Sequence, residues 1–355
     1  MKIAHYTIRF HTPAFLGNAE QSGQWRTPPF KAQLRQWWRV AYAATHNFRP
    51  DLKAMRHQEG CLFGHAWLED DKGERGERIA ARRSLVRLRL GEWSVGTMTD
   101  WPISKHKVKH PEVPQPVAAD LYMGFGPVVL PRGSSTPTLK ATAAIQADEY
   151  TKMSLAFPEE HAELIEAALA LMSRFGTVGG RSRNGWGSYN LTPDDTTPAL
   201  SVATPIRPWS DALTLDWPHA IGADARGALI WQTQPCSDWI EMMKVLATLK
   251  IGLRTQFKFH SGKNAAHPED RHWLSYPVTN HSVQAWGQNL RLPNTLRFKA
   301  CAIPNEPGKL VGLIFHTPSL PPPRFQPDIT EIKGVWSKVH SFLDSPTQQL
   351  SRITA

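Results

Sequence analysis

The sequence predicts an α+β protein made of two consecutive units, each of which mixes strands and helices. Its length of 355 residues corresponds to roughly two domains at about 150 residues each. Strand-like alternation and helix-like spacing of apolar residues occur in both halves of the chain. Between these halves, residues 193–211 are rich in Pro, Thr and Ser, which is typical of a linker. We therefore expect domains at residues 1–192 and 212–355.

The first domain begins with a predicted strand over residues 6–12, where polar and apolar side chains alternate. A helix is expected after Thr27-Pro28-Pro29, because prolines favour the first turn of a helix. Its apolar residues recur at helical spacing: Leu34, Trp37, Trp38, Ala41 and Tyr42. Between about residues 61 and 140 the pattern breaks up into charged, Pro-rich and Gly-rich segments around a short strand at 85–90. We expect an elaborated insertion there.

Regular structure is expected again from residue 142, with an extended segment to 157 and an amphipathic helix opened by Pro158-Glu159-Glu160. A glycine-rich loop at 176–187 and a strand at 188–191 follow. The second domain shows the same mixture of elements, and we predict a strand at 228–232, a helix at 238–249, strands at 295–303 and 310–316, and a helix between 327 and 343. Without a visible fixed period, this layout alone suggests a duplicated architecture.

The composition points to a polyanionic partner. The 41 Lys and Arg residues against 31 Asp and Glu leave a formal charge of +10, and 41% apolar residues exclude wholesale disorder. Cationic side chains bind phosphate backbones by displacing counterions, and an anionic membrane surface would suit the charge equally well. The 14 Trp, 6 Tyr and 14 Phe residues are interleaved with this charge, which favours nucleic acid. Alternatively, the tryptophans simply build the core.

Several observations predict a cytoplasmic protein without a cofactor. No apolar run approaches the roughly 18 residues that cross a bilayer, and the first residues resemble a strand rather than a signal peptide. The cysteines Cys61, Cys236 and Cys301 form no Cys-x-x-Cys pair. We expect them to be buried thiols in a reducing compartment.

The glycine-rich loop at 176–187 is the most informative motif. Cofactor loops follow a strand and open a helix, whereas this loop follows a helix and lacks the Gly-Lys pair of a phosphate loop, so a nucleotide cofactor is not expected. Its five glycines permit close backbone approach to a ligand, Arg181, Arg183 and Asn184 offer phosphate contacts, and Trp186 offers a stacking face. The alternative is a helix cap and tight turn with Trp186 in the core.

The helix after Pro28 carries a second candidate site. Lys31, Arg35 and Arg39 advance by only about 40° at each step of four residues, so they form a basic stripe beside the apolar face. Such a stripe can hold phosphates. The alternative is that the arginines are solvated residues at the edge of that face.

Two basic segments are weaker candidates. Lys105, Lys107 and Lys109 would lie on one side of an extended strand and contact phosphates, although a solvated loop explains them as well. A basic and aromatic cluster follows the helix of the second domain. It either lines a nucleic-acid-binding groove together with the other candidates or belongs to a solvent-exposed loop. It consists of Phe257, Lys258, Phe259, His260, Lys263, His267, Asp270, Arg271 and His272.

His57, Cys61 and His65 are spaced four residues apart and could bind a metal from one helix face. However, Gly60 and Gly64 argue against a helix there. We therefore expect no metal site.

Four features together resemble the RAMP superfamily of CRISPR effector subunits: Thr12-Pro13-Ala14-Phe15-Leu16-Gly17, the Pro-Pro helix with Trp37-Trp38-Arg39, Leu62-Phe63-Gly64, and the loop Gly179–Gly187. The match covers roughly residues 1–190 and is greatest to the first subunit of the type III-B Cmr complex. It implies two tandem ferredoxin-like (RRM-like) domains. The chain departs from the family pattern at Phe30 and Ala32, where a small polar residue and a glycine are more usual.

The resemblance also implies a function. It implies a non-catalytic RNA-binding subunit near the 3′ end of the guide RNA, which helps to capture target RNA in antiviral defence. The implied partners are guide RNA, target RNA and other effector subunits, with no membrane and no cofactor. The implied RNA-binding residues are Lys31, Arg35, Arg39, Arg181, Ser182, Arg183 and Asn184.

Two other classes of function stay open. A metal-independent RAMP endoribonuclease that processes guide RNA would use one of the 15 histidines as a general base. Against this, neither the glycine loop nor the Pro-Pro helix contains a histidine. A purely structural cap that contacts only neighbouring subunits is the third possibility.

Overall fold

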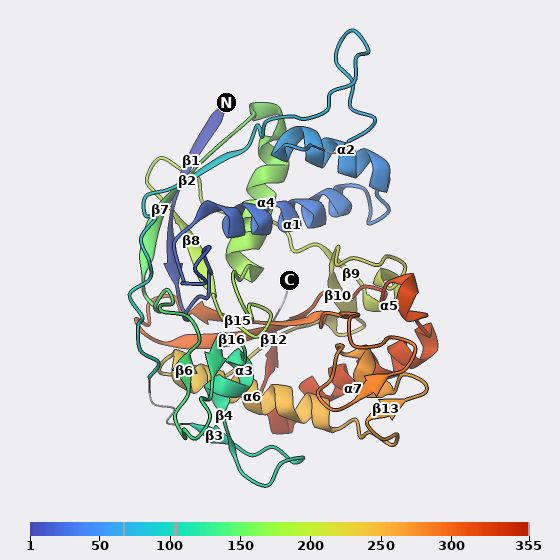
Figure 1. The fold of residues 1–355 in the computed structure, drawn as a ribbon. Coiled ribbons are helices and arrows are strands. Elements are labelled where there is room, and N and C mark those ends of the chain that lie inside the picture. The colour runs from blue at the N-terminus through green and yellow to red at the C-terminus, as the bar shows by residue number, and fades with distance from the viewer. Residues whose placement is uncertain (67, 103–105, 354–355) are drawn as a thin grey trace. The chain divides into compact units, whose positions relative to one another are not determined.

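The computed structural model describes residues 1–66, 68–102 and 106–353, which pack as two compact units. Figure 1 shows their elements. Unit 1 comprises Met1–Thr99, Ala141–Gly180 and Gly187–Pro205. Unit 2 comprises Asp100–Lys140, Arg181–Trp186 and the chain from Ile206 onward. The units therefore interleave along the sequence.

Unit 1 is built on a four-stranded antiparallel sheet of order β2-β7-β1-β8. Helices α1 and α4 pack together on one face of this sheet (Figure 1). The elements of unit 1 are β1 (Lys2–Phe10), α1 (Thr27–Thr45), α2 (Leu52–Phe63), β2 (Arg87–Leu90), β7 (Tyr150–Phe157), a 3-10 turn (Glu159–His161), α4 (Ala162–Phe175) and β8 (Tyr189–Pro193).

Unit 2 contains a second four-stranded antiparallel sheet, of order β15-β16-β12-β17. Its main elements are β12 (Ile230–Gln232), α6 (Trp239–Thr255), β15 (Leu296–Ala302), β16 (Leu310–His316), α7 (Ile329–Leu343) and β17 (Ser351–Arg352). Shorter elements surround them: β3 (Lys107–Val108), β4 (Val117–Ala118), α3 (Ala119–Gly124), β5 (Val128–Val129), β6 (Thr138–Leu139), β9 (Ile206–Pro208), α5 (Trp209–Ala212), β10 (Ile221–Asp224), β11 (Gly227–Ala228), β13 (Asn264–Ala265), the 3-10 turn η2 (Asp270–Trp273), β14 (Ser282–Val283), and 3-10 turns at Pro323–Phe325 and Pro346–Gln348.

The two large sheets have the same connectivity. In each unit the main elements follow the order strand, helix, strand, strand, helix, strand. In each sheet the first strand lies between the third and the fourth, and the second strand lies at the edge beside the third. The mixed α and β composition expected from the sequence is therefore present in both units.

The core of unit 1 lies between its sheet and its helices. Strand β1 alternates buried and more exposed residues, so Ile8 and Phe10 face inward. Helix α1 starts with prolines in its first turn and buries Phe30, Leu34 and Trp37. A buried aromatic cluster thus fixes the position of the α1 stripe.

The core of unit 2 is centred on β16, in which every residue is buried. Helices α6 and α7 cover this sheet, with α6 capped by Asp238 and α7 by Asp328. Neighbouring strand β15 buries two charged side chains, Arg297 and Lys299. Among the residues that the structure describes, no helix is long and apolar enough to cross a membrane.

The helices expected after Pro28, after Pro158, at 238–249 and at 327–343 are all present. The argument against a helix around Gly60 was wrong, since α2 runs from Leu52 to Phe63. Asp51 caps this helix, accepting hydrogen bonds from two backbone N–H groups. Gly60 lies where the helix packs closely on Leu68, so that a Cβ would overlap the leucine side chain.

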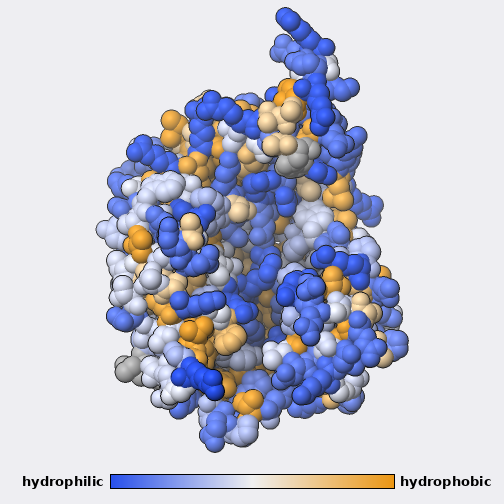
Figure 2. Space-filling view, in the orientation of Figure 1, coloured by the Kyte–Doolittle hydropathy of each residue, from blue (hydrophilic) through white to orange (hydrophobic). Residues whose placement is uncertain are grey.

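The region expected as one insertion in the first domain is divided between the units. Residues up to Thr99 pack in unit 1. Within them, an antiparallel bridge between Lys72 and Arg78 closes a hairpin, which projects from the surface and is hydrophilic (Figure 2). Residues 100–140 pack in unit 2, because α3 lies against α6 and Trp101 contacts Trp239. Part of the expected linker is regular structure, namely β9 and α5.

Candidate nucleic-acid interface

The basic stripe on α1 exists, but its arginines are held by an acidic residue. Glu59 of α2 is 4% exposed and accepts a hydrogen bond of 2.8 Å from the Nε of Arg35. It also accepts two bonds of 2.8 Å from the Nε and one terminal nitrogen of Arg39. The arginine side chains stay 32% and 44% exposed. Both guanidinium groups are thus ordered, yet one carboxylate offsets part of their charge.

Lys31 begins the stripe and has no acidic partner among the described residues. Its side chain is half-buried, and burial, followed by the nearby charge of Arg35, lowers the pKa of its amine. An anion that approached this end of α1 would stabilise the charged amine and so offset both effects. The structure therefore favours Lys31 as the phosphate contact of the stripe.

The loop at 181–186 docks against other parts of unit 2. The Nδ2 of Asn184 donates to the carbonyl of Met123 at 2.7 Å, and its Oδ1 accepts from the Nζ of Lys250 at 2.8 Å. The Nε of Arg181 donates to the carbonyl of Phe125 at 2.5 Å. Asn184 thus links parts of unit 2. Because its side chain is engaged in these two bonds, it does not offer the phosphate contact that the sequence suggested.

Arg183 and Ser182 have a different environment. The carbonyl of Arg183 accepts from the N–H of Phe298 at 3.1 Å, which anchors the loop backbone on β15. The side chain of Arg183 is exposed and forms no ion pair with a described residue. Ser182 is half-buried, and its carbonyl accepts from the N–H of Gly185 at 3.1 Å in a tight turn. Within this loop, Arg183 is the side chain best placed to meet a phosphate.

The loop glycines serve close packing of the chain on itself. Gly179 has φ +91°, and a Cβ there would lie 2.7 Å from the carbonyl oxygen of Phe15. Gly187 has φ +62°, and a Cβ there would overlap the carbonyl oxygen of Val178. Both contacts lie within unit 1. These two glycines are thus explained by the path of the chain and by left-handed backbone conformations.

The expectation that Trp186 offers a stacking face was wrong. This side chain is fully buried and packs edge-on against Trp101 and Trp239, with ring centroids 5.4 and 5.7 Å away. The three rings form an aromatic core of unit 2. The alternative interpretation of the loop, with its tryptophan in the core, is therefore correct for this residue.

Of the three lysines expected on one strand, Lys107 and Lys109 are exposed on either side of the buried Val108. Strand β3 pairs with β4 through Lys107 and Val108, and Lys109 directly follows the strand. Lys105 lies outside the described residues. Lys107 and Lys109 form a small, open cationic surface.

Unit 2 also contains buried cations that the sequence interpretation missed. Burial, followed by the charges of Arg254 and Arg181, lowers the pKa of Lys250 to about 7. Burial lowers the pKa of Arg297 to about 9 and that of Lys299 to about 8. The available signals were the alternation of charged and apolar residues in β15 and the spacing of four between Lys250 and Arg254 on α6.

The basic and aromatic cluster after α6 is only partly assembled. The guanidinium of Arg271 lies 5.3 Å from the ring centre of Phe259, and His272 lies 5.0 Å from it. Asp270 pairs instead with Lys338 of α7, while His267 is exposed. Of this cluster, Phe259, Arg271 and His272 therefore lie in contact with one another.

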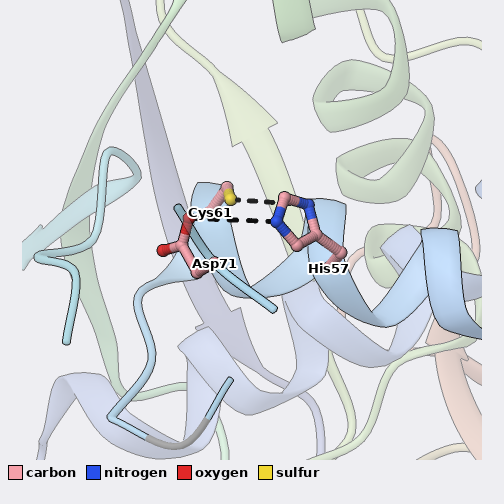
Figure 3. A group of neighbouring side chains, drawn as sticks. All are labelled: His57, Cys61 and Asp71. Atoms are coloured by element: carbon pink, nitrogen blue, oxygen red, sulfur yellow. Dashed lines mark hydrogen bonds and ion pairs between the residues drawn. The ribbon is translucent and has the colours of Figure 1, made fainter. Parts of the chain in front are cut away.

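The histidine and cysteine of α2, His57 and Cys61, lie beside Asp71 (Figure 3). Ligand atoms of His57, Cys61 and Asp71 all lie within 4.8 Å of one another. Asp71, however, already accepts two hydrogen bonds from Arg82 and one from His65, at 2.5 to 2.8 Å. These bonds, chiefly those from Arg82, hold the pKa of Asp71 at about 2. Burial raises the pKa of the Cys61 thiol, which disfavours the thiolate that a metal would need. This donor set is poorly suited to a metal ion.

No protein-family model matches the sequence, and neither does any curated protein. The chain is similar to the crystal structure of apo Cmr1 from Pyrococcus furiosus, with 15% identity, a TM-score of 0.46 and coverage of 97% of this chain and 98% of that one. It is also similar to a chain of the type III-B Cmr-beta bound to cognate target RNA, with 10% identity, a TM-score of 0.46 and coverage of 96% and 99%. A chain of a type IV-B CRISPR complex matches 57% of this chain and 95% of its own length, with 14% identity and a TM-score of 0.31. Similarity at this level assigns no activity to the chain.

Proposed function

We propose that the chain is a non-catalytic RNA-binding subunit of a type III-B CRISPR (Cmr) effector ribonucleoprotein. The observation that carries this proposal is that four of the cations predicted to contact RNA have no acidic partner among the described residues, namely Lys31, Lys107, Lys109 and Arg183. Such cations gain most from a polyanion, because no carboxylate already offsets their charge. The resemblance of the sequence motifs to the RAMP superfamily implies that this polyanion is RNA.

The fold proposed with this function is a pair of tandem ferredoxin-like domains. Its support is the element order that the two units share and the position of the first strand between the third and the fourth. In such a fold two helices cover one face of an antiparallel sheet. The interleaved segments 100–140 and 181–186 are elaborations of that plan.

The place of the chain in the complex follows from the motif resemblance alone. We place it near the 3′ end of the guide RNA, where it would help to capture target RNA alongside other effector subunits. Its contacts with RNA would use phosphates and base stacking, which require no particular sequence.

The proposal that the chain does not cleave RNA is supported by the environment of three of its 15 histidines. His316 and His340 bond to each other at 2.9 Å in the core of unit 2, and burial lowers the pKa of both. His65 is buried and bonded to Asp71. None of these three side chains can reach a solvent-exposed ribose as a general base. Incubation of repeat RNA with the protein in EDTA tests this directly, and cleaved product under single-turnover conditions would favour the processing nuclease.

The test of RNA binding uses the full chain and a fluorescent single-stranded RNA over a series of salt concentrations. Replacing Lys107 and Lys109 by Gln removes two open cations, while Lys333→Gln removes an exposed cation from α7 as a matched control. Each lost phosphate contact lowers the slope of log K against log salt by about 0.7. The double variant should therefore lower the slope by about 1.4, and the control should leave it unchanged.

A flat salt dependence in the wild type, both alone and within its complex, would refute the proposal. If the chain binds RNA only within its complex, the same variants should weaken target capture by the assembled particle. Variants that lose assembly without any loss of RNA affinity would instead support a structural cap.

A further inference from the structure

A cavity of about 530 Å³ lies within unit 2, beside the end of α6. Four parts of the unit line it: the C-terminal end of α6 and the residues after it, the 3-10 turn η2, the turn at 278–281, and part of the segment 110–122. A volume of this size accommodates one nucleotide. The cavity shares no residue with the α1 stripe or with the open lysines of β3.

The cavity is strongly cationic. Arg254, Lys258 and Arg271 line it, and Glu112 is its one acidic residue among those that the structure describes. Glu112 accepts a hydrogen bond of 2.5 Å from Arg271, so Arg271 already offsets the negative charge of this carboxylate. The charges of Arg254 and Arg271 repel each other, which is one cause of a lowered pKa at Arg254 after the larger effect of burial.

Both arginines have unused hydrogen-bond donors. Arg271 is only 5% exposed, yet its Nε donates to no acceptor among the described residues, and the same holds for the Nε of Arg254. Buried donors of charged groups are costly when unpaired. Two guanidinium groups with unpaired donors in one cavity therefore suit an anion with several acceptor oxygens, such as a phosphate.

An aromatic surface lies beside these cations. Phe259 and His281 stack on each other with ring centroids 3.8 Å apart and planes within 10°. Both side chains are half-buried, so part of the pair faces the cavity, and Tyr122 lines the cavity as well. A phosphate ion alone would not need such a surface. An unstacked base would gain from it.

A larger cavity of about 850 Å³ adjoins the first and shares Val278, Asn280 and His281 with it. Lys263 and Arg291 line this second cavity together with the side-chain amides of Gln284 and Gln288. A strand that placed one nucleotide in the first cavity would thus find further cations and hydrogen-bond donors for the next. The continuity favours a polynucleotide over a free mononucleotide.

We propose that the cavity of Arg254, Phe259, Arg271 and His281 binds one unstacked nucleotide of single-stranded RNA. The two arginines contact its phosphate, and the aromatic pair stacks on its base. This inference rests on the proposed RNA-binding function and assigns a specific site to it.

The test compares RNA affinities of full-length variants. Arg254→Met keeps the apolar part of the side chain but removes the charge, and Phe259→Leu keeps an apolar group but removes the aromatic face. The exposed Arg324→Met is the matched control. We expect each of the first two variants to weaken binding about tenfold or more, because Arg254→Met removes a charged phosphate contact and Phe259→Leu removes one base stack. The control should bind within twofold of the wild type, and all three should unfold at similar temperatures.

A second readout maps the site directly. RNA that contains 4-thiouridine should crosslink under ultraviolet light to peptides with Phe259 or His281, and these crosslinks should disappear in Phe259→Leu if the base stacks there. Crosslinks confined to other peptides, or variants with wild-type affinity, would overturn the cavity site and leave the proposed function intact. A wild-type chain without RNA affinity at low salt, both alone and within its complex, would overturn both.

Inorganic phosphate and uridine monophosphate serve as competitors. We expect neither to displace the RNA at millimolar concentration, since a strand also occupies the adjoining cavity. Displacement by either one at micromolar concentration would show a site for a small anion or a free nucleotide, and would overturn the RNA assignment.

Discussion

Replacement of Glu59 by Gln should lower the stability of unit 1 and raise RNA affinity at the same time. The carboxylate of Glu59 holds Arg35 and Arg39 through three hydrogen bonds of 2.8 Å. Glutamine keeps the size of the side chain but loses the charge. The substitution therefore frees two cations on α1 and removes one anion beside them.

The expected magnitudes follow from this geometry. A hydrogen bond to a charged group contributes about 1.5–3 kcal/mol when fully buried. Here the arginines are 32% and 44% exposed, and exposed pairs contribute less than about 1 kcal/mol, so we expect a loss of about 1–2 kcal/mol for the three bonds together. In a unit of this size that loss lowers the melting temperature by about 2–8 °C.

The gain in RNA binding is electrostatic. A charge removed about 7 Å from a phosphate is worth about 0.6 kcal/mol in water, which is close to threefold in affinity. Two freed guanidinium groups could also each contact a phosphate, which would steepen the salt slope by up to about 1.4. Tighter binding by a less stable protein distinguishes this outcome from simple damage to the fold.

The assay combines thermal unfolding with RNA titration at several salt concentrations. Glu166→Gln on α4 is the matched control, because it removes the same charge from unit 1 at a residue that pairs with Lys2. A lower melting temperature with unchanged affinity and slope would show that α1 is not part of the RNA surface. An unchanged melting temperature would show that the ion pairs contribute no stability.

Two further predictions concern the loop and the buried lysine. Lys250 has a folded pKa near 7 against an ordinary 10.5, so the unfolded state binds more protons between these values and the unfolding free energy rises with pH across this window, by at most about 1.4 kcal/mol per unit. Chemical denaturation from pH 7 to 9 should show this rise in the wild type. Lys250→Met should reduce the rise most between pH 7 and 8, because Lys299, with a pKa of about 8, contributes its own rise above that value. Gly187→Ala should destabilise unit 1 by about 2 kcal/mol or more, since its Cβ would overlap the carbonyl oxygen of Val178, and a melting temperature equal to that of the wild type would contradict the packing role of this glycine.

Much of the fold could be predicted because its elements have clear periodicity. Strand β16 is a continuous apolar run bounded by turn residues, and α1 buries aromatic residues at helical spacing. Helix α2 was missed because Gly60 has a low helix propensity, and tertiary packing against Leu68 decides the outcome there.

The assignment of segments to units could not be predicted in the same way. Residues 100–140 belong to unit 2 because α3 packs on α6, a contact between segments more than 100 residues apart. Local patterns contain no information about such a contact. The same limit applies to Trp186, whose neighbours in a glycine loop suggested exposure while Trp101 and Trp239 enclose it.

The candidate site was predicted in part for a related reason. Sequence clustering identified Phe259 and Arg271, which lie 12 residues apart in a basic and aromatic segment. Arg254 and Tyr122 were not identified, since they reach the same cavity from α6 and from the segment 110–122. A site lined by four separate segments has no compact sequence signature.

The cations of this chain should contribute to RNA binding in two separable ways. Lys107 and Lys109 are open to solvent, so their contribution comes from counterion release and disappears as salt rises. The cavity of Arg254 and Phe259 is partly screened from solvent, and stacking depends little on salt. In a plot of log K against log salt, loss of the two lysines should therefore change the slope, whereas Phe259→Leu should lower the affinity extrapolated to 1 M salt and leave the slope unchanged. If both changes altered only the slope, the cavity would act as a further patch of surface charge and not as a nucleotide site.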